Sequence, residues 1–104
     1  MRTTYYENGQ KATEEYIVGG KYHRENGPAY AEWNINGQKS CEGYYIHGLR
    51  HRENGPAYTR WDINMRVSSE LYYINGNRRS IEYFLTRGFK RNKCKRCNAI
   101  YLEK

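Results

Sequence analysis

The sequence predicts an all-β protein, a repeat array of short antiparallel β-hairpins followed by a short basic C-terminal segment. Residues 23–30 recur unchanged as residues 51–58, an offset of 28 positions, so the chain contains an internal repeat. Asn-Gly pairs follow aromatic and β-branched runs at regular spacing, which is a hairpin signal. Tyrosine occurs 12 times among 104 residues, and its apolar body and polar tip suit a thin sheet that is wet on both faces.

The repeat extends well beyond the identical octapeptide. At the same offset the chain repeats aromatic residues and glycines: Tyr5, Trp33 and Trp61; Tyr16, Tyr44 and Tyr72; Gly20, Gly48 and Gly76. The array therefore begins at or before Tyr5 and fades after Arg79. Aromatic residues alternate at spacings of 17 and 11 positions, which predicts six hairpin-like units, alternately long and short.

Turn chemistry supports this division. We expect both residues of pairs such as Asn36-Gly37 and Asn75-Gly76 to adopt positive φ, which Asn and Gly tolerate best. Pro28 and Pro56 cannot donate a hydrogen bond to a central strand, so Asn-Gly-Pro is predicted to form a second turn. The next strand alternates, with small residues and a Trp on one face, which indicates close approach of a neighbouring strand or hairpin.

The end of the chain differs from the repeats in composition and charge. Residues 81–85 are apolar enough to cap the last repeat, as a short helix or a final strand. Residues 1–85, the predicted repeat body, carry 11 Lys and Arg against 10 Asp and Glu, whereas residues 86–104 carry 7 against one. Attraction to nucleic acid or to an acidic partner is therefore expected mainly in the basic tail, residues 86–104.

Two features identify a resemblance to known repeat proteins. Tyr-x-x-Gly turns at regular spacing resemble MORN-type repeats, which form ribbons of successive β-hairpins. The segment His-Arg-Glu-Asn-Gly-Pro-Ala at residues 23–29 and 51–57 is similar to the repeat of MORN-like proteins encoded by bacteriophages and large DNA viruses. The resemblance covers residues 5–79 and departs from the Gly-rich MORN pattern in its 17/11 alternation. It implies a viral accessory protein that binds a host component, and it implies no reaction.

The His-Arg-Glu triplets allow two interpretations. His51, Arg52 and Glu53, or their earlier copies, are the residue types of an acid/base nuclease, in which Arg would hold a phosphate. Because the triplet is duplicated together with its turn residues, we favour a structural role: Arg and Glu would pair, and His would bond a backbone carbonyl. We therefore predict that the protein is not an enzyme.

The cysteines leave the question of a metal open. Cys94 and Cys97 have the Cys-x-x-Cys spacing that lets two thiolates bind one zinc ion. The alternative is a reduced thiol pair, and no other cofactor is indicated. A complete site needs more ligands, either from the body or across a homodimer. Cys41, at a position held by Thr13 and Ser69 in the other repeats, is predicted to be a small packed residue.

Two sets of residues are candidates for partner binding. Six cations of the tail could bind phosphates or an acidic surface: Arg87, Lys90, Arg91, Lys93, Lys95 and Arg96. Tyr45 and Tyr73 each follow another tyrosine, and we expect one member of each pair to pack the ribbon. The other member would shield the outer face or present it to a partner.

These observations predict a non-enzymatic viral protein that binds, and inhibits, a host protein or protein–nucleic-acid complex such as a defence system. The alternative is a nucleic-acid-binding module that uses the basic tail. No apolar run reaches the roughly 18 residues of a membrane span, and the N-terminus lacks the apolar core of a signal peptide. We therefore expect no membrane contact and a location in the host cytoplasm.

Overall fold

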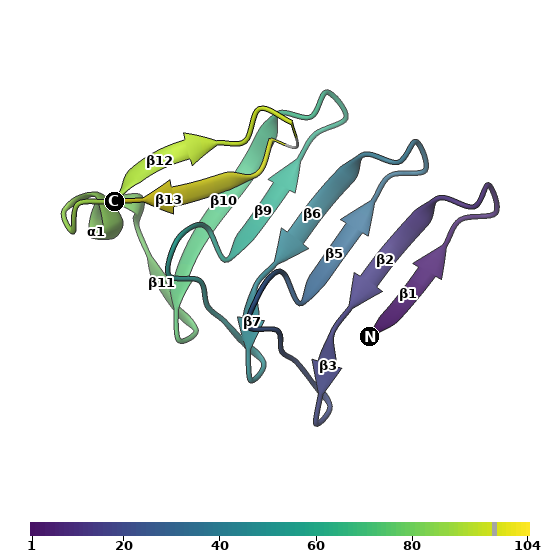
Figure 1. The fold of residues 1–104 in the computed structure, drawn as a ribbon, viewed down its shortest axis with the longest axis horizontal. Helices are drawn as coiled ribbons and strands as arrows, with labels where there is room; N and C mark the ends of the chain where they lie inside the picture. Colours follow the sequence, from purple (N-terminus) through teal and green to yellow (C-terminus); the bar gives the residue numbers. More distant parts are fainter. Residues whose placement is uncertain (97) are drawn as a thin grey trace.

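The computed structural model describes residues 1–96 and 98–104, and its main feature is one antiparallel sheet (Figure 1). The order of its seven strands is β1-β2-β5-β6-β9-β10-β11. The molecule measures 46 × 35 × 18 Å, so it is a thin plate. The sheet comprises β1 (Arg2–Tyr5), β2 (Lys11–Glu15), β5 (Tyr30–Trp33), β6 (Lys39–Gly43), β9 (Tyr58–Trp61), β10 (Val67–Ile74) and β11 (Asn77–Arg79).

Smaller elements complete the array. Two short hairpins are formed by β3 (Ile17–Val18) with β4 (Lys21–Tyr22) and by β7 (Tyr45–Ile46) with β8 (Leu49–Arg50). Together with β10–β11 and the three long hairpins β1–β2, β5–β6 and β9–β10 they make six hairpins, alternately long and short. The predicted all-β array of short antiparallel hairpins is confirmed.

The two kinds of hairpin turn in different ways. In the short hairpins both turn residues have positive φ, for example His47 at 50° and Gly48 at 81°. In the long hairpins only the second residue does: Gly37 has φ 90°, while the Asn36 side chain accepts a hydrogen bond from the Gln38 N–H at 3.0 Å. The prediction of two positive φ values is therefore wrong for the long turns, because Asn36 acts through its side chain and a bulge absorbs the extra residue.

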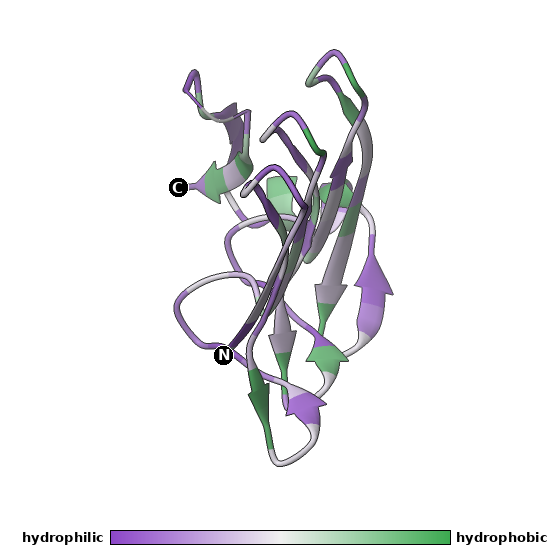
Figure 2. Cartoon of the chain, turned by 90° about the vertical axis from the view of Figure 1, so that its right-hand side faces the viewer, coloured by the Kyte–Doolittle hydropathy of each residue, from purple (hydrophilic) through white to green (hydrophobic). Residues whose placement is uncertain are grey.

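Each strand places alternate residues on two chemically distinct faces. The first, here called the loop face, carries the small residues Ala31 (3% exposed) and Thr59 (1% exposed). The loops that hold the repeated octapeptide also lie on this side (Figure 2). The opposite face carries Tyr30 and Tyr58, and Gly43 lies between them across the sheet. The predicted alternation and the close packing of the small residues are confirmed.

The C-terminal segment folds onto the loop face of the last repeat. It comprises the helix α1 (Ile81–Leu85) and the hairpin of β12 (Lys90–Lys93) with β13 (Ile100–Glu103). The hairpin lies over β10 and reaches toward β9, and α1 lies beyond the β10–β11 edge of the sheet (Figure 1). Tyr72, Phe84 and Leu102 form a buried cluster, and the Trp61 Nε1–H donates to the Asn98 carbonyl at 3.1 Å. Of the two predicted forms of cap, the structure has the helix.

One ion pair shows that the β12–β13 hairpin supplies a cation that the third repeat lacks. Lys11 pairs with Glu14, and 28 residues later Lys39 pairs with Glu42, both at 3.0 Å. The next position in the series is Val67, so Glu70 has no lysine on its own strand. Arg91 of β12 supplies the cation, with Nη2 at 2.9 Å from Glu70 Oε1.

Among the described residues, no helix has the length and apolar character needed to cross a membrane.

Candidate functional site

The face opposite the loops carries a row of aromatic rings, which we call the tyrosine ladder: Tyr22, Tyr30, Tyr45, Tyr58 and Tyr73, with Arg50 among them. The Tyr22 ring lies 5.5 Å from that of Tyr30 and 5.2 Å from that of Tyr45. Where the first repeat has Tyr22, the second has Arg50. Rings and guanidinium therefore continue one row from repeat to repeat.

Arg50 joins the tyrosines of the second half of the ladder. Its Cζ lies 4.8 Å from the Tyr58 ring centre and 5.2 Å from that of Tyr73. It also donates hydrogen bonds to the Tyr45 hydroxyl at 3.4 Å and the Tyr73 hydroxyl at 3.3 Å. These contacts fix the side chains that line the face, so a partner would meet a preformed surface. Sequence reasoning missed Arg50, although its 28-residue spacing from Tyr22 could have revealed it.

The structure separates the members of each tyrosine pair, as predicted. Tyr45 and Tyr73 belong to the ladder and are half-buried. Tyr44 and Tyr72 lie on the loop face, where Tyr72 is 4% exposed and packs on Phe84 with ring centres 5.3 Å apart. One tyrosine of each pair therefore packs the ribbon, and the other is left on the outer surface.

Two acidic groups on the ladder face accept hydrogen bonds from neutral donors, and one of them also pairs with an arginine. The Tyr22 hydroxyl donates to Glu15 at 2.6 Å, and this bond, followed by that from Arg2, lowers the pKa of the Glu15 carboxyl. The Cys41 thiol donates to Glu32 at 3.0 Å. Burial, and then that hydrogen bond, raises the pKa of Cys41 to about 12. Cys41 is 1% exposed, as expected of a packed residue, and it is a protonated thiol at neutral pH.

Alkaline pH is expected to unfold the protein. The hydrogen bond to Glu15 raises the pKa of Tyr22 to about 12, and burial raises those of Tyr44 and Tyr72 to about 12. In the unfolded chain these groups ionise near pH 10, so their stabilisation is complete below about pH 10 and is lost as the pH rises to about 12. Urea midpoints measured between about pH 8 and 12 should stay level up to about pH 10 and fall between about pH 10 and 12. Midpoints that stay constant would contradict this.

The repeated octapeptide joins successive repeats through its histidine. The Asn75 N–H donates to His51 Nδ1 at 2.9 Å, and the His47 N–H donates to His23 Nδ1 at the same distance. Each histidine thus accepts from the turn of the following short hairpin, where we had expected it to donate to a carbonyl. Because Nδ1 accepts, the proton of the neutral ring is on Nε2, which faces Glu53 at 3.6 Å in the second copy.

The arginine of the octapeptide stacks on a tyrosine of the same repeat. Arg52 Cζ lies 4.0 Å from the Tyr44 ring centre, and Nη1 donates to the Pro56 carbonyl at 3.2 Å. An added Cβ at Gly55 would collide with the Arg52 guanidinium, so a larger residue there would require the arginine side chain to move. The predicted Arg–Glu pair is therefore wrong: the arginine faces an aromatic ring, and the glutamate faces the histidine.

These contacts bear on the nuclease hypothesis. The His51 ring has its Nδ1 lone pair engaged and its Nε2 proton directed at Glu53, so neither nitrogen is placed to accept a proton from water. Arg52 is held between Tyr44 and backbone carbonyls. The triplet therefore makes the contacts of a structural joint, and the absence of an enzymatic activity stays a prediction.

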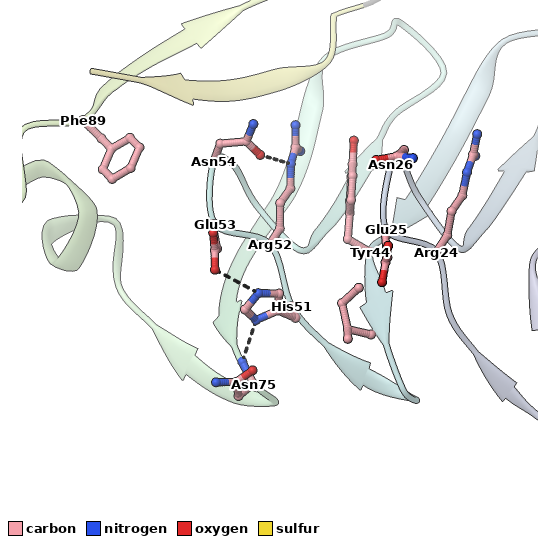
Figure 3. Close-up of a pocket in the computed structure, with 12 residues that line it drawn as sticks. Arg24, Glu25, Asn26, Tyr44, His51, Arg52, Glu53, Asn54, Asn75 and Phe89 are labelled. Carbon is pink, nitrogen blue, oxygen red and sulfur yellow. Dashed lines mark hydrogen bonds and ion pairs between the residues drawn. The ribbon is translucent and has the colours of Figure 1, made fainter. Parts of the chain in front are cut away.

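A groove of about 830 Å³ lies between the two copies of the loop (Figure 3). The loops 24–27 and 51–54 form its sides, Tyr44 and Ile46 line it between them, and it extends past Asn54 to Phe89. The planar groups of Arg24, Tyr44 and Arg52 stand side by side along it. Of these residues, the sequence had singled out His51, Arg52 and Glu53 with the first copies Arg24 and Glu25 as candidate chemistry. It had also indicated Tyr44 as a member of a tyrosine pair.

The structure distributes the six basic residues of the tail between two roles. Arg91 pairs with Glu70, and Arg87 stacks on Tyr83 with Cζ 3.7 Å from the ring centre. The remaining cations are solvent-exposed on or next to the β12–β13 hairpin: Lys90, Lys93, Lys95 and Arg96. We call these four residues the basic hairpin cluster. Tyr101, on β13, is 36% exposed.

The predicted zinc ligands are only partly within the described structure. Cys94 is half-buried just after β12, and Cys97 lies outside the described residues. Within residues 1–96 and 98–104, no three His, Cys, Asp or Glu side chains gather in a way that could hold a metal ion. The zinc hypothesis stays a prediction.

Comparison of the chain with models of protein families, with curated proteins and with solved structures gives no match. The relationship to MORN-like repeats therefore stays a prediction.

Proposed function

We propose that this chain is a non-enzymatic binding protein that engages a host protein through its tyrosine ladder. The observation that carries the proposal is the composition and freedom of that face. Tyrosine and arginine are the residue types enriched at protein interfaces and at their energetic centres. The C-terminal helix and hairpin lie on the loop face (Figure 2), so they leave the ladder open.

The rigidity of the ladder supports the same function. Arg50 holds Tyr45 and Tyr73 by hydrogen bonds, and Gly43 leaves room for the Tyr45 ring above the sheet. A surface whose side chains are already fixed loses little conformational entropy on binding. The resemblance to viral MORN-like repeats extends the proposal to a viral accessory protein that inhibits its host target.

Removing the ladder tyrosines is expected to abolish capture of a host protein. The immobilised chain would be incubated with nuclease-treated lysates of bacterial and eukaryotic hosts, with the double variant Tyr45→Ala/Tyr73→Ala alongside. We expect at least about a tenfold loss of the captured protein. Tyr5→Ala is the control, because Tyr5 is 65% exposed and lies outside the ladder. Equal capture by both variants, with thermal melts showing that both are folded, would contradict the proposal.

The exposed cations of the basic hairpin cluster favour a second function, binding of nucleic acid. They lie on or next to a folded hairpin, and Tyr101, which is opposite Asn92 on the same hairpin, could stack on a base. Deleting the tail is not a clean test, because Ile100 and Leu102 are 1% and 2% exposed and belong to the packed interior. Substitution of the exposed cations leaves that packing in place.

If the cluster binds phosphates, a triple variant, Lys90→Gln/Lys93→Gln/Lys95→Gln, should weaken binding to labelled DNA and RNA. The slope of log Kd against log salt should fall by about 2–3. The matched control, Lys21→Gln/Arg66→Gln/Arg78→Gln, removes as many exposed charges from the body. A similar slope for both variants would show that net charge, and not the cluster, governs the attraction.

A further inference from the structure

The C-terminal strand fills a groove in the third repeat. Tyr72 and Ile74 line this groove, and Leu102 of β13 packs there with Phe84. The strand is also held by its backbone: the Leu102 N–H donates to the Asn54 carbonyl at 2.6 Å, and Arg52 Nη1 donates to the Ile100 carbonyl at 3.2 Å. The octapeptide loop thus serves as a docking edge for an extended segment.

The open groove of the second repeat is the equivalent of this filled one. Its lining residues Tyr44 and Ile46 stand 28 positions before Tyr72 and Ile74. Its loop residues Arg24 and Asn26 stand 28 positions before Arg52 and Asn54. In the described part of the chain β13 occupies the third repeat, and the corresponding loop edge of the second repeat is open (Figure 3). The lining differs in one respect, because Arg52 stacks on the Tyr44 ring whereas Tyr72 packs on Phe84.

The docking edge is repeated with its geometry. Arg24 stacks on Tyr16 with Cζ 4.0 Å from the ring centre and donates to the Pro28 carbonyl at 3.2 Å, which are the contacts that Arg52 makes with Tyr44 and Pro56. In the second copy the guanidinium also reaches the Ile100 carbonyl. In the first copy Arg24 lines the open groove.

We propose that this groove binds an extended segment of a partner protein, with aliphatic side chains at alternate positions as in Ile100-Tyr101-Leu102. One carbonyl of the segment accepts from Arg24, and the N–H two residues later donates to the Asn26 carbonyl. An aliphatic side chain enters between the loops over Ile46. The site is on the face opposite the tyrosine ladder, so it goes beyond the function proposed above and stands or falls separately.

The chain itself supplies the probe. A blocked, fluorescent peptide with the sequence of residues 98–104 would be titrated into the intact protein up to about 1 mM, with binding followed by anisotropy and located by amide NMR shifts. The matched peptide has serine in place of Ile100 and Leu102. We expect shifts at loops 24–27 and 51–54 with the first peptide and none with the second.

Three protein variants locate the site. Ile46→Ser should weaken binding by about tenfold or more, because it removes the aliphatic lining residue. Val18→Ser is the control, since Val18 stands 28 positions earlier, is 63% exposed and lies outside the groove. The ladder variant Tyr45→Ala/Tyr73→Ala should bind the peptide as the unmodified protein does, which separates this proposal from the first.

Three results would overturn the proposal. The first is an absence of shifts at the highest peptide concentration. The second is a set of shifts around Leu102 and Tyr72, which would mean that the peptide displaces β13 and leaves the open groove empty. The third is a dimer that forms with rising protein concentration in sedimentation experiments. Its formation, without peptide, would shift the amide signals of loops 24–27 and 51–54. The occupant would then be a second copy of this chain and not a partner protein.

Discussion

Replacing Phe84 with alanine is expected to lower the free energy of unfolding by about 3–5 kcal/mol. Phe84 is 2% exposed and contacts three aromatic rings, those of Tyr72, Tyr83 and Phe89. A plate 18 Å thick has little interior, and the cluster around Phe84 is the hydrophobic core found in the described residues. The loss would be a large share of the roughly 5–15 kcal/mol that stabilises a typical domain.

Urea denaturation followed by circular dichroism and by tryptophan fluorescence would measure the effect. Leu85→Ala is the control, because Leu85 is next to Phe84 in the sequence but its side chain is 43% exposed. This substitution should lower the free energy of unfolding by less than about 0.5 kcal/mol. The two signals should give one transition for the unmodified protein if the cap and the repeats unfold together. A loss below about 1 kcal/mol for Phe84→Ala would show that the cap adds little to the stability of the array.

The sequence predicted most of the repeat body because its signals are local. The octapeptide fixed the period, and the Gly-containing turns fixed the hairpins, since few residues other than Asn and Gly adopt positive φ. The prediction for the long turns was wrong in detail, because an Asn such as Asn36 can either adopt positive φ or accept a hydrogen bond through its side chain. Both uses have the same sequence pattern.

The remaining features depend on contacts between distant parts of the chain. The pairing of Arg91 with Glu70 becomes visible only when Val67 is recognised as a missing lysine. The stacking of Arg52 on Tyr44 joins residues on separate segments of the second repeat, and an identical repeat of the motif does not say what the motif touches. The groove could not be predicted either, because it is recognised by comparison with the third repeat. There the C-terminal strand packs against the loop at Asn54, which lies far from that strand in the sequence.

Arginine substitutions in the two octapeptides are expected to have unequal effects. Arg52→Ala should destabilise the protein by about 3 kcal/mol, and Arg24→Ala by about 1–2 kcal/mol less. Both variants lose a stacked tyrosine and a bond to a proline carbonyl, at equal distances. Only Arg52 also donates to the Ile100 carbonyl of the C-terminal strand and to the Asn54 side chain, so the difference measures these two bonds together.

Urea midpoints of the two variants and of Arg52→Lys would test this. Lysine keeps the charge but cannot reproduce the planar stack and the forked hydrogen bonds, so Arg52→Lys should recover only part of the loss. Equal losses for Arg52→Ala and Arg24→Ala would mean that the bond to Ile100 contributes nothing. A larger loss at Arg52 is the result expected if the octapeptide loop gains stability when a strand lies against it, and such a gain is the condition for the open copy at Arg24 to bind a strand from another chain.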